Sequence, residues 1–262
     1  MKSQTKVAIL LSATTMCVEA QTELHEQIVF DAHASSDRIK FVSSRQYDIA
    51  EVRINDYLIP TKLNLIVPPT IGKETIKFAP QAFSWMNAPN TDVVLDFRRD
   101  GHKFCESQTD WTRMFYNSCS LVSVNFEGVS CKPFIKKMTG MFEGCSRLKQ
   151  IFWGDLDTSN VIAMDSMFRG CEAMEEIDLS NFKTTRVETM NHMFSSCHKL
   201  KSLDLRKLDA SNVKDINGMF KNCNALKFID MCLFRPSLMQ NIDQMFIGRA
   251  HVTVNYPFRV YR

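Results

Sequence analysis

Histidine and glutamate residues near the N-terminus are the first candidates for chemistry. His25 and Glu26 begin like the H-E-x-x-H motif of a zinc metalloprotease helix. The next histidine is His33, eight residues after the first, and this spacing does not place two ligands on one helical face. The chain also lacks a glycine-rich phosphate loop and a G-x-S-x-G motif. We therefore predict no catalytic residues, no metal site and no cofactor.

Cysteine is the second reactive residue type, with nine in the chain. Four of them, Cys145, Cys171, Cys197 and Cys223, recur every 26 residues. No two cysteines have the C-x-x-C spacing of a zinc site. A regular recurrence favours a repeated core position over a disulfide framework, because free cysteine packs as a small hydrophobic side chain.

The elements that position these residues are internal repeats. The dipeptide Met-Phe occurs six times, with gaps of 27, 26, 26, 26 and 26 residues, at Met114, Met141, Met167, Met193, Met219 and Met245. Seven residues after each of the first five comes an L-x-x-L-x-L pattern, as in Leu200, Leu203 and Leu205. The final alternation predicts a strand with one buried face.

A turn and a short helix are expected after each strand. Residues 157–160 are Asp, Thr, Ser and Asn, whose short side chains favour turns and helix caps. The apolar residues that follow are spaced by three or four, as on one face of a helix: Val161, Met164, Met167, Phe168 and Cys171. One unit buries too few side chains to fold alone, since ordering each residue costs about 1.5 kcal/mol. We therefore predict an α/β solenoid of stacked units with parallel strands about 4.8 Å apart.

The repeat resembles a known family. Residues 193–205 read M-F-S-S-C-H-K-L-K-S-L-D-L, and residues 179–184 read L-S-N-F-K-T. They resemble the BspA-type leucine-rich repeats, also called DUF285 or the 26-residue surface-protein repeat, over about residues 112 to 247. The resemblance implies a solenoid of surface proteins that serves adhesion and protein binding. This chain departs from the pattern at its ends, where Cys119 is displaced by one position and Phe234-Arg235-Pro236 replaces the usual turn.

The sequence divides into four expected parts. Residues 1–20 are a signal peptide or a first strand, because Lys2 and Lys6 precede an apolar run and Val18 and Ala20 suit cleavage before Gln21. Residues 21–82 form a small β module or N-terminal cap, with strands at 27–30, 38–42, 49–54, 57–67 and 75–78. Residues 83–247 hold five to six repeat units, and residues 248–262 form a capping strand in which Val252, Val254, Tyr256 and Phe258 alternate with polar residues.

The candidate binding surface follows from the strand alternation. Residues between the buried strand positions point outward in three columns, which are Ser123/Gln150/Glu176/Ser202/Phe228, Asn125/Phe152/Asp178/Asp204/Asp230 and Glu127/Gly154/Ser180/Arg206/Cys232. Exposed aromatic residues mark recognition surfaces. The stacked aspartates either gather a cation or basic partner, or are solvated residues that belong to the repeat itself. The candidate partner-binding residues are Phe152, Asp178, Asp204, Arg206, Phe228 and Asp230.

Composition narrows the function class. The 32 basic and 29 acidic residues are interspersed, so no basic patch for nucleic acid is present, and beyond the N-terminal run no stretch reaches the length of a membrane span. We expect a noncatalytic module, at the cell surface or secreted, that binds a protein or glycan through the strands. The alternative is a structural role in a particle or scaffold, such as a phage virion component, in the cytoplasm or on a virion.

Overall fold

The structure of the chain is a computed structural model. It describes the backbone of residues 8–10, 25–31, 39–45, 48–54, 62–66, 70–71, 74–75 and 77–78. Backbone and side chains are described for residues 83, 92–97, 109–129, 135–234, 244–248 and 252–255.

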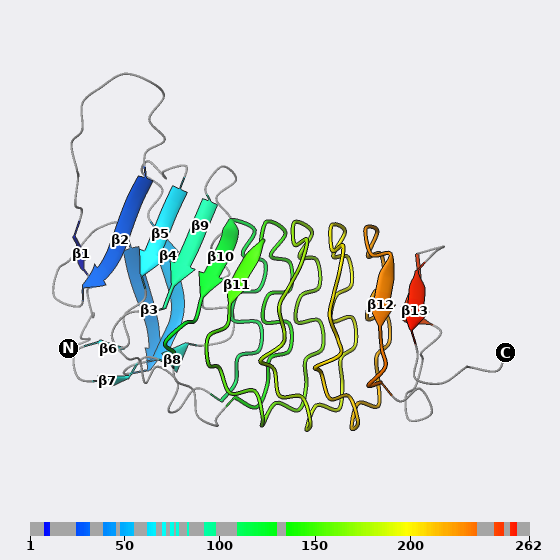
Figure 1. Ribbon diagram of the computed structural model, residues 1–262. Helices are drawn as coiled ribbons and strands as arrows, with labels where there is room; N and C mark the ends of the chain where they lie inside the picture. Colours follow the sequence, from blue (N-terminus) through cyan, green and yellow to red (C-terminus); the bar gives the residue numbers. More distant parts are fainter. Residues whose placement is uncertain are drawn as a thin grey trace, which may run out of the picture.

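A six-stranded sheet runs from the N-terminal strands into the repeats (Figure 1). Its strands in spatial order are β1 (Ala8–Leu10), β2 (His25–Asp31), β5 (Lys62–Ile66), β9 (Asp92–Asp96), β10 (Leu121–Asn125) and β11 (Gln150–Phe152). The β1–β2 pair is antiparallel and all the others are parallel. Strands β2 and β5 lie where the sequence predicts strands. The sheet of the repeats therefore continues into the segment that precedes them.

Three smaller sheets complete the described part of the fold. The first contains β3 (Ile39–Arg45), β4 (Asp48–Ile54) and β8 (Lys77–Phe78), and the second pairs β6 (Thr70–Ile71) with β7 (Glu74–Thr75). In the third, β12 (Phe228–Asp230) pairs in parallel with β13 (Thr253–Asn255). Strand β13 lies in the stretch expected to cap the repeats; Tyr256 and Phe258 lie outside the described residues.

The repeat units stack in register. Parallel bridges join Lys137 to Ala163, Ala163 to Thr189 and Thr189 to Asp215, each 26 residues further along the chain. Together with the parallel pairs of β9, β10 and β11, these bridges give a repeat fold with parallel strands, as expected.

The prediction of a short helix in each unit is wrong. Its place is taken by consecutive turns, and none of the described residues forms an α-helix. The N–H groups of Ser166, Phe168 and Gly170 donate to carbonyls of the next unit at 2.7, 2.9 and 2.8 Å. Those of Arg169 and Cys171 donate to the carbonyl three residues earlier, both at 3.1 Å. In an α-helix every N–H group donates to the carbonyl four residues earlier. The N–H groups that bond to the next unit would then no longer be available to hold the stack together.

Residues with positive φ enforce this alternation between bonds to the next unit and bonds within the turn. Ser166 has a φ of 54° and Gly170 a φ of 73°, and an α-helix excludes both values. The same two places in the other units also have positive φ, at Arg113, Asn117, Gly140, Gly144, His192, Ser196, Gly218, Asn222 and Gly248. Glycine and asparagine at several of these places adopt this conformation at low cost. Within the described ranges, the chain has no helix long and apolar enough to cross a membrane.

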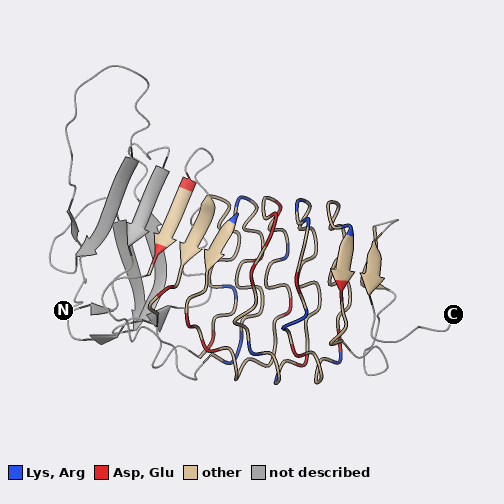
Figure 2. Ribbon diagram, in the orientation of Figure 1, with Lys and Arg blue, Asp and Glu red and all other residues tan. Residues whose placement is uncertain are grey.

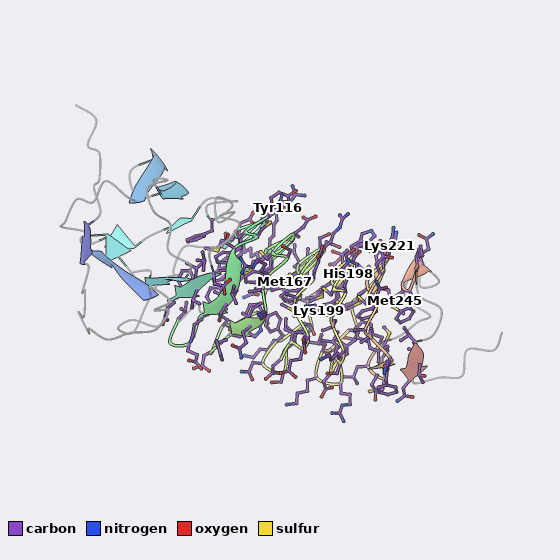
Figure 3. The ribbon with its side chains drawn as sticks, turned by 90° about the horizontal axis from the view of Figure 1, so that it is seen from above. Tyr116, Met167, His198, Lys199, Lys221 and Met245 are labelled. Atoms are coloured by element: carbon purple, nitrogen blue, oxygen red, sulfur yellow. The ribbon has the colours of Figure 1, made fainter. Side chains whose placement is uncertain are left out.

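Aromatic rings form a continuous column through the core. From Phe115 to Phe246, neighbouring Phe rings of successive units are stacked, with centroids 5.0 to 5.9 Å apart and interplanar angles of 3 to 16°. Phe83 extends the column by stacking on Phe115 at 5.0 Å. Met167 and Met245 lie inside the stack, whereas Tyr116 and Lys221 lie on the side away from β10 and β11 (Figure 3). Like residues therefore rest on like residues, as the period predicts.

The recurring cysteines are free and buried, which confirms their core position. Each thiol also donates a hydrogen bond to the Phe carbonyl of the preceding unit, for example Cys197 Sγ to Phe168 O at 3.1 Å. Cys145, Cys171 and Cys223 do the same, and Ser118 occupies this position in the first unit, where its hydroxyl donates to Phe83 O at 2.6 Å. Burial raises the pKa of the Cys171 and Cys197 thiols well above the ordinary value, which disfavours the reactive thiolate.

Alkylation of the native chain should separate the cysteines into two groups. Cys119 is exposed and should react with iodoacetamide at the rate of a free thiol. The four buried cysteines should react at least about a hundredfold more slowly, because local opening of a packed unit costs about 3 kcal/mol or more. Mass spectrometry of peptides from a time course measures both rates. Fast labelling of Cys197 in the folded chain would contradict the packed core.

Candidate functional site

The outward side of the strand segments is one continuous surface, which we call the strand face. It consists of segments 123–127, 150–154, 176–180, 202–206 and 228–232. Five of the six predicted site residues are exposed there, and Asp230 is half-buried: Phe152, Asp178, Asp204, Arg206, Phe228 and Asp230. Phe152 and Phe228 are 40% and 52% exposed, and both belong to the few large hydrophobic side chains that the core leaves uncovered.

The acidic column has a structural task. In Asp178, Asp204 and Asp230, one carboxylate oxygen accepts a hydrogen bond from the backbone N–H two residues later, at 2.8 to 3.0 Å. Asn125 makes the same bond to Glu127 in the first unit, at 2.8 Å. This is an Asx turn, which ends each strand segment and turns the chain toward the next side of the unit. The aspartates thus belong to the repeat itself, one of the two interpretations that the sequence leaves open.

These hydrogen bonds lower the pKa values of Asp178 and Asp204. The backbone N–H of Ser180 holds the pKa of Asp178 below its ordinary value. Hydrogen bonds from the Arg206 side chain and backbone lower the pKa of Asp204 to about 2. Because the folded pKa is depressed, the stabilisation from Asp204 is complete above about pH 4 and is lost as the pH falls through about 2.

Two of the three aspartates use their second oxygen as well. Arg206 Nη2 donates to Asp204 Oδ2 at 2.8 Å, while Arg206 Nε binds Oδ1 at 2.9 Å. Asp230 Oδ2 accepts from Asn255 Nδ2 at 3.2 Å. Asp178 Oδ2 has no hydrogen-bond or ion-pair partner among the described residues. Asp178 is therefore the aspartate of the column whose charge remains available to a partner.

A shallow groove with a volume of about 970 Å³ lies on the strand face. Phe152, Asp178 and Asp204 line it, together with Trp153, Glu176 and Lys199. Arg206, Phe228 and Asp230 are not among its lining residues. The structure thus brings three of the six predicted residues into one concave site and leaves the other three beside it.

The groove lies where strand pairing is interrupted. Strand β11 ends the six-stranded sheet, and β12 pairs with β13. The described residues 176–179 and 202–205, between β11 and β12, form no strand, although Lys201 N–H still donates to Glu175 O at 2.9 Å.

Charge is distributed unevenly across the strand face. Lys149, Lys199, Lys201 and Lys227 lie where the strand segments begin, and the aspartates lie where they end. Figure 2 shows this order at β12, where blue directly precedes the strand and its end is red. Glu175 and Glu176 are acidic exceptions at the beginning of segment 176–180, and Lys201 Nζ pairs with Glu175 Oε2 at 2.5 Å.

Lys149, Glu175 and Lys199 line the groove but are not among the predicted site residues. Only the outward strand positions were considered, whereas Lys149 and Glu175 immediately precede their strand segments and Lys199 lies three residues before its own. The fixed period offers the missing signal for two of them, because Lys149 and Glu175 occupy the same place in successive units. His33 lies outside the described residues. Within the described ranges, no three His, Cys, Asp or Glu side chains gather as metal ligands would.

Comparisons with known proteins agree with the repeat. The family model described as "Mycoplasma protein of unknown function, DUF285" matches residues 109–229 and, in a second alignment, residues 136–256. No curated protein sequence matches the chain. A solved leucine-rich-repeat protein of T. pallidum, TpLRR, is 13% identical over 82% of this chain and 96% of that one, with a TM-score of 0.30 that supports no further argument. Because the family model covers more than half of the chain and the repeats have its 26-residue pattern, this chain belongs to the DUF285 family of BspA-type leucine-rich-repeat proteins.

Proposed function

We propose that the chain is a noncatalytic binding or adhesion module, at the cell surface or secreted, that recognises a protein or glycan partner through the strand face. The observation that carries the proposal is Phe152. In the other units this column holds Asp or Asn, whose oxygen accepts the backbone hydrogen bond of the Asx turn. A Phe ring cannot accept that bond, and this ring is 40% exposed instead of buried. Folding therefore gains little from Phe152, whereas a binding partner would gain an apolar anchor.

Further support comes from the setting of the ring. It lies in a groove, beside carboxylates, on a stack in which each unit is held by its neighbours. A rigid surface loses little entropy on binding, which favours recognition. Membership of a surface-type repeat family supports the location. Treatment of intact cells with a protease tests it, since digestion of the repeats without lysis is expected.

The binding proposal is tested with a variant that keeps every Asx turn. In it Phe152 and Phe228 become Ala, while Asp178 and Asp204 become Asn, which still accepts the backbone bond as Asn125 does. Biolayer interferometry against extracellular matrix proteins and a glycan panel should show binding by the original chain and at least about tenfold weaker binding by the variant.

The matched control carries Ile162→Ala and Glu172→Gln. Both residues are exposed and neither lines the groove. The control should bind as the original chain does. Equal binding by the four-residue variant would overturn the assignment of the strand face.

A further inference from the structure

We infer that the groove takes a polypeptide segment in which a Lys or Arg lies within two residues of a large apolar side chain. The inference rests on the proposed function and narrows its partner class from protein or glycan to a cationic and apolar peptide segment. Its grounds are an apolar surface and carboxylates without an ion-pair partner among the described residues, next to each other in the groove.

The apolar part of the groove is centred on Phe152. This side chain is 40% exposed, and Ile151 and Ile177, both half-buried, line the groove beside it. Ile177 packs against the core, so the floor of the groove is continuous with it. An apolar side chain that covers the Phe152 ring would remove from water a surface that this chain leaves exposed.

The cationic part follows from the carboxylates that remain unpaired. Glu175 is paired with Lys201, and Asp204 with Arg206. Glu176 and Asp178 are exposed and have no ion-pair partner within the described ranges. They are two residues apart in segment 176–180, and both line the groove.

The two parts are separated by one unit of the stack. Phe152 and Asp178 occupy the same column in neighbouring units, whose core rings Phe142 and Phe168 lie 5.9 Å apart. In an extended peptide, side chains on one side recur about every 6.6 Å. A cationic and an apolar side chain within two residues of each other therefore reach both parts at once.

Lys149 and Lys199 give the segment a direction. Both line the groove, Lys149 directly before β11 and Lys199 three residues before segment 202–206. A second cation there would be repelled, whereas a partner carboxylate or carbonyl would be attracted. A neutral glycan would leave Glu176 and Asp178 uncompensated, and a polyanionic one would be repelled by them. Charge complementarity thus favours a polypeptide.

The test uses the full chain and three short fluorescein-labelled peptides. One alternates lysine and leucine, the second lysine and serine, and the third glutamate and leucine. Fluorescence anisotropy should show the tightest binding for the lysine–leucine peptide, with the other two at least about tenfold weaker. Phe152→Ala and Asp178→Asn should each weaken binding of the lysine–leucine peptide by about tenfold. Asp178→Asn should also reduce the salt dependence of that binding. The control substitutions Ile162→Ala and Glu172→Gln should change neither the affinity for the peptide nor its salt dependence.

Two results with the peptides would overturn the inference. One is equal binding of the lysine–leucine peptide by the original chain and both groove variants, which is nonspecific attraction. The other is binding of the glutamate–leucine peptide as tight as that of the lysine–leucine peptide. A neutral glycan that binds in a Phe152-dependent way, without peptide binding, would also overturn it while leaving the proposed function intact. If no probe depends on the strand face, both fail.

Discussion

Replacement of Phe194 by alanine should lower the free energy of unfolding by about 3 to 5 kcal/mol. The ring is fully buried and stacks on Phe168 at 5.5 Å and on Phe220 at 5.7 Å. Truncation removes both ring contacts and leaves a cavity in the middle of the column, which the tightly bonded units cannot close. Urea unfolding followed by circular dichroism measures the loss.

The matched control is Phe228→Ala, because this ring is 52% exposed on the strand face. We expect a change of less than about 1 kcal/mol for it. A loss for Phe194→Ala as small as that of the control would mean that the Phe column does not hold the units together.

Gly154→Ala should destabilise the chain by about 3 kcal/mol or more. Gly154 has a φ of 56°, which strains any residue with a Cβ atom. An added Cβ atom would lie 2.7 Å from Glu127 Cα and 2.9 Å from Phe126 O. Both are backbone atoms of the preceding unit, and the Phe126 N–H is bonded to Phe152 O at 2.7 Å, so neither can move cheaply.

Gly170→Ala separates the two causes. Gly170 has a φ of 73°, but the nearest atom to its added Cβ would be Gly144 Cα at 3.5 Å, an ordinary contact. Ser196 and Asn222 occupy the same place in later units with φ of 61° and 59°. Gly170→Ala should therefore cost only about 1 kcal/mol. Thermal unfolding of the two variants compares them, and equal losses would contradict the close approach at Gly154.

Much of the stack is predictable from the period alone. A fixed spacing requires that Phe168 lie on Phe142 and Cys197 on Cys171, and burial of these residues follows because one unit cannot fold by itself. The exposure of Phe152 and Phe228 follows equally from the alternation of a strand with one buried face.

The missing helices have a clear physical reason. Apolar residues spaced by three or four also arise in consecutive turns whose alternate N–H groups bond to the next unit. The helical pattern records which side chains are buried and carries no information about the hydrogen-bond partners. Glycines at positions 140, 144, 170 and 218 were the available signal, since left-handed backbone at two places per unit excludes a helix.

The groove could not be predicted in the same way. It depends on the interruption of strand pairing after β11 and on which carboxylates find partners. Asp178 and Asp204 are equivalent in the sequence pattern, yet only Asp204 is neutralised, because Arg206 takes the place that Ser180 holds in the preceding unit. The sequence shows the change of residue type, but the Arg206–Asp204 ion pair that results from it is seen only when side chains are placed in space.

The most direct test of the strand face as the binding surface is a backbone amide NMR titration of the labelled full chain with the lysine–leucine peptide. We expect the largest chemical-shift changes at residues 149–154, 175–181 and 199–204, which surround the groove. Changes concentrated instead around Tyr116 and Lys221, on the side away from the strands, would contradict the account.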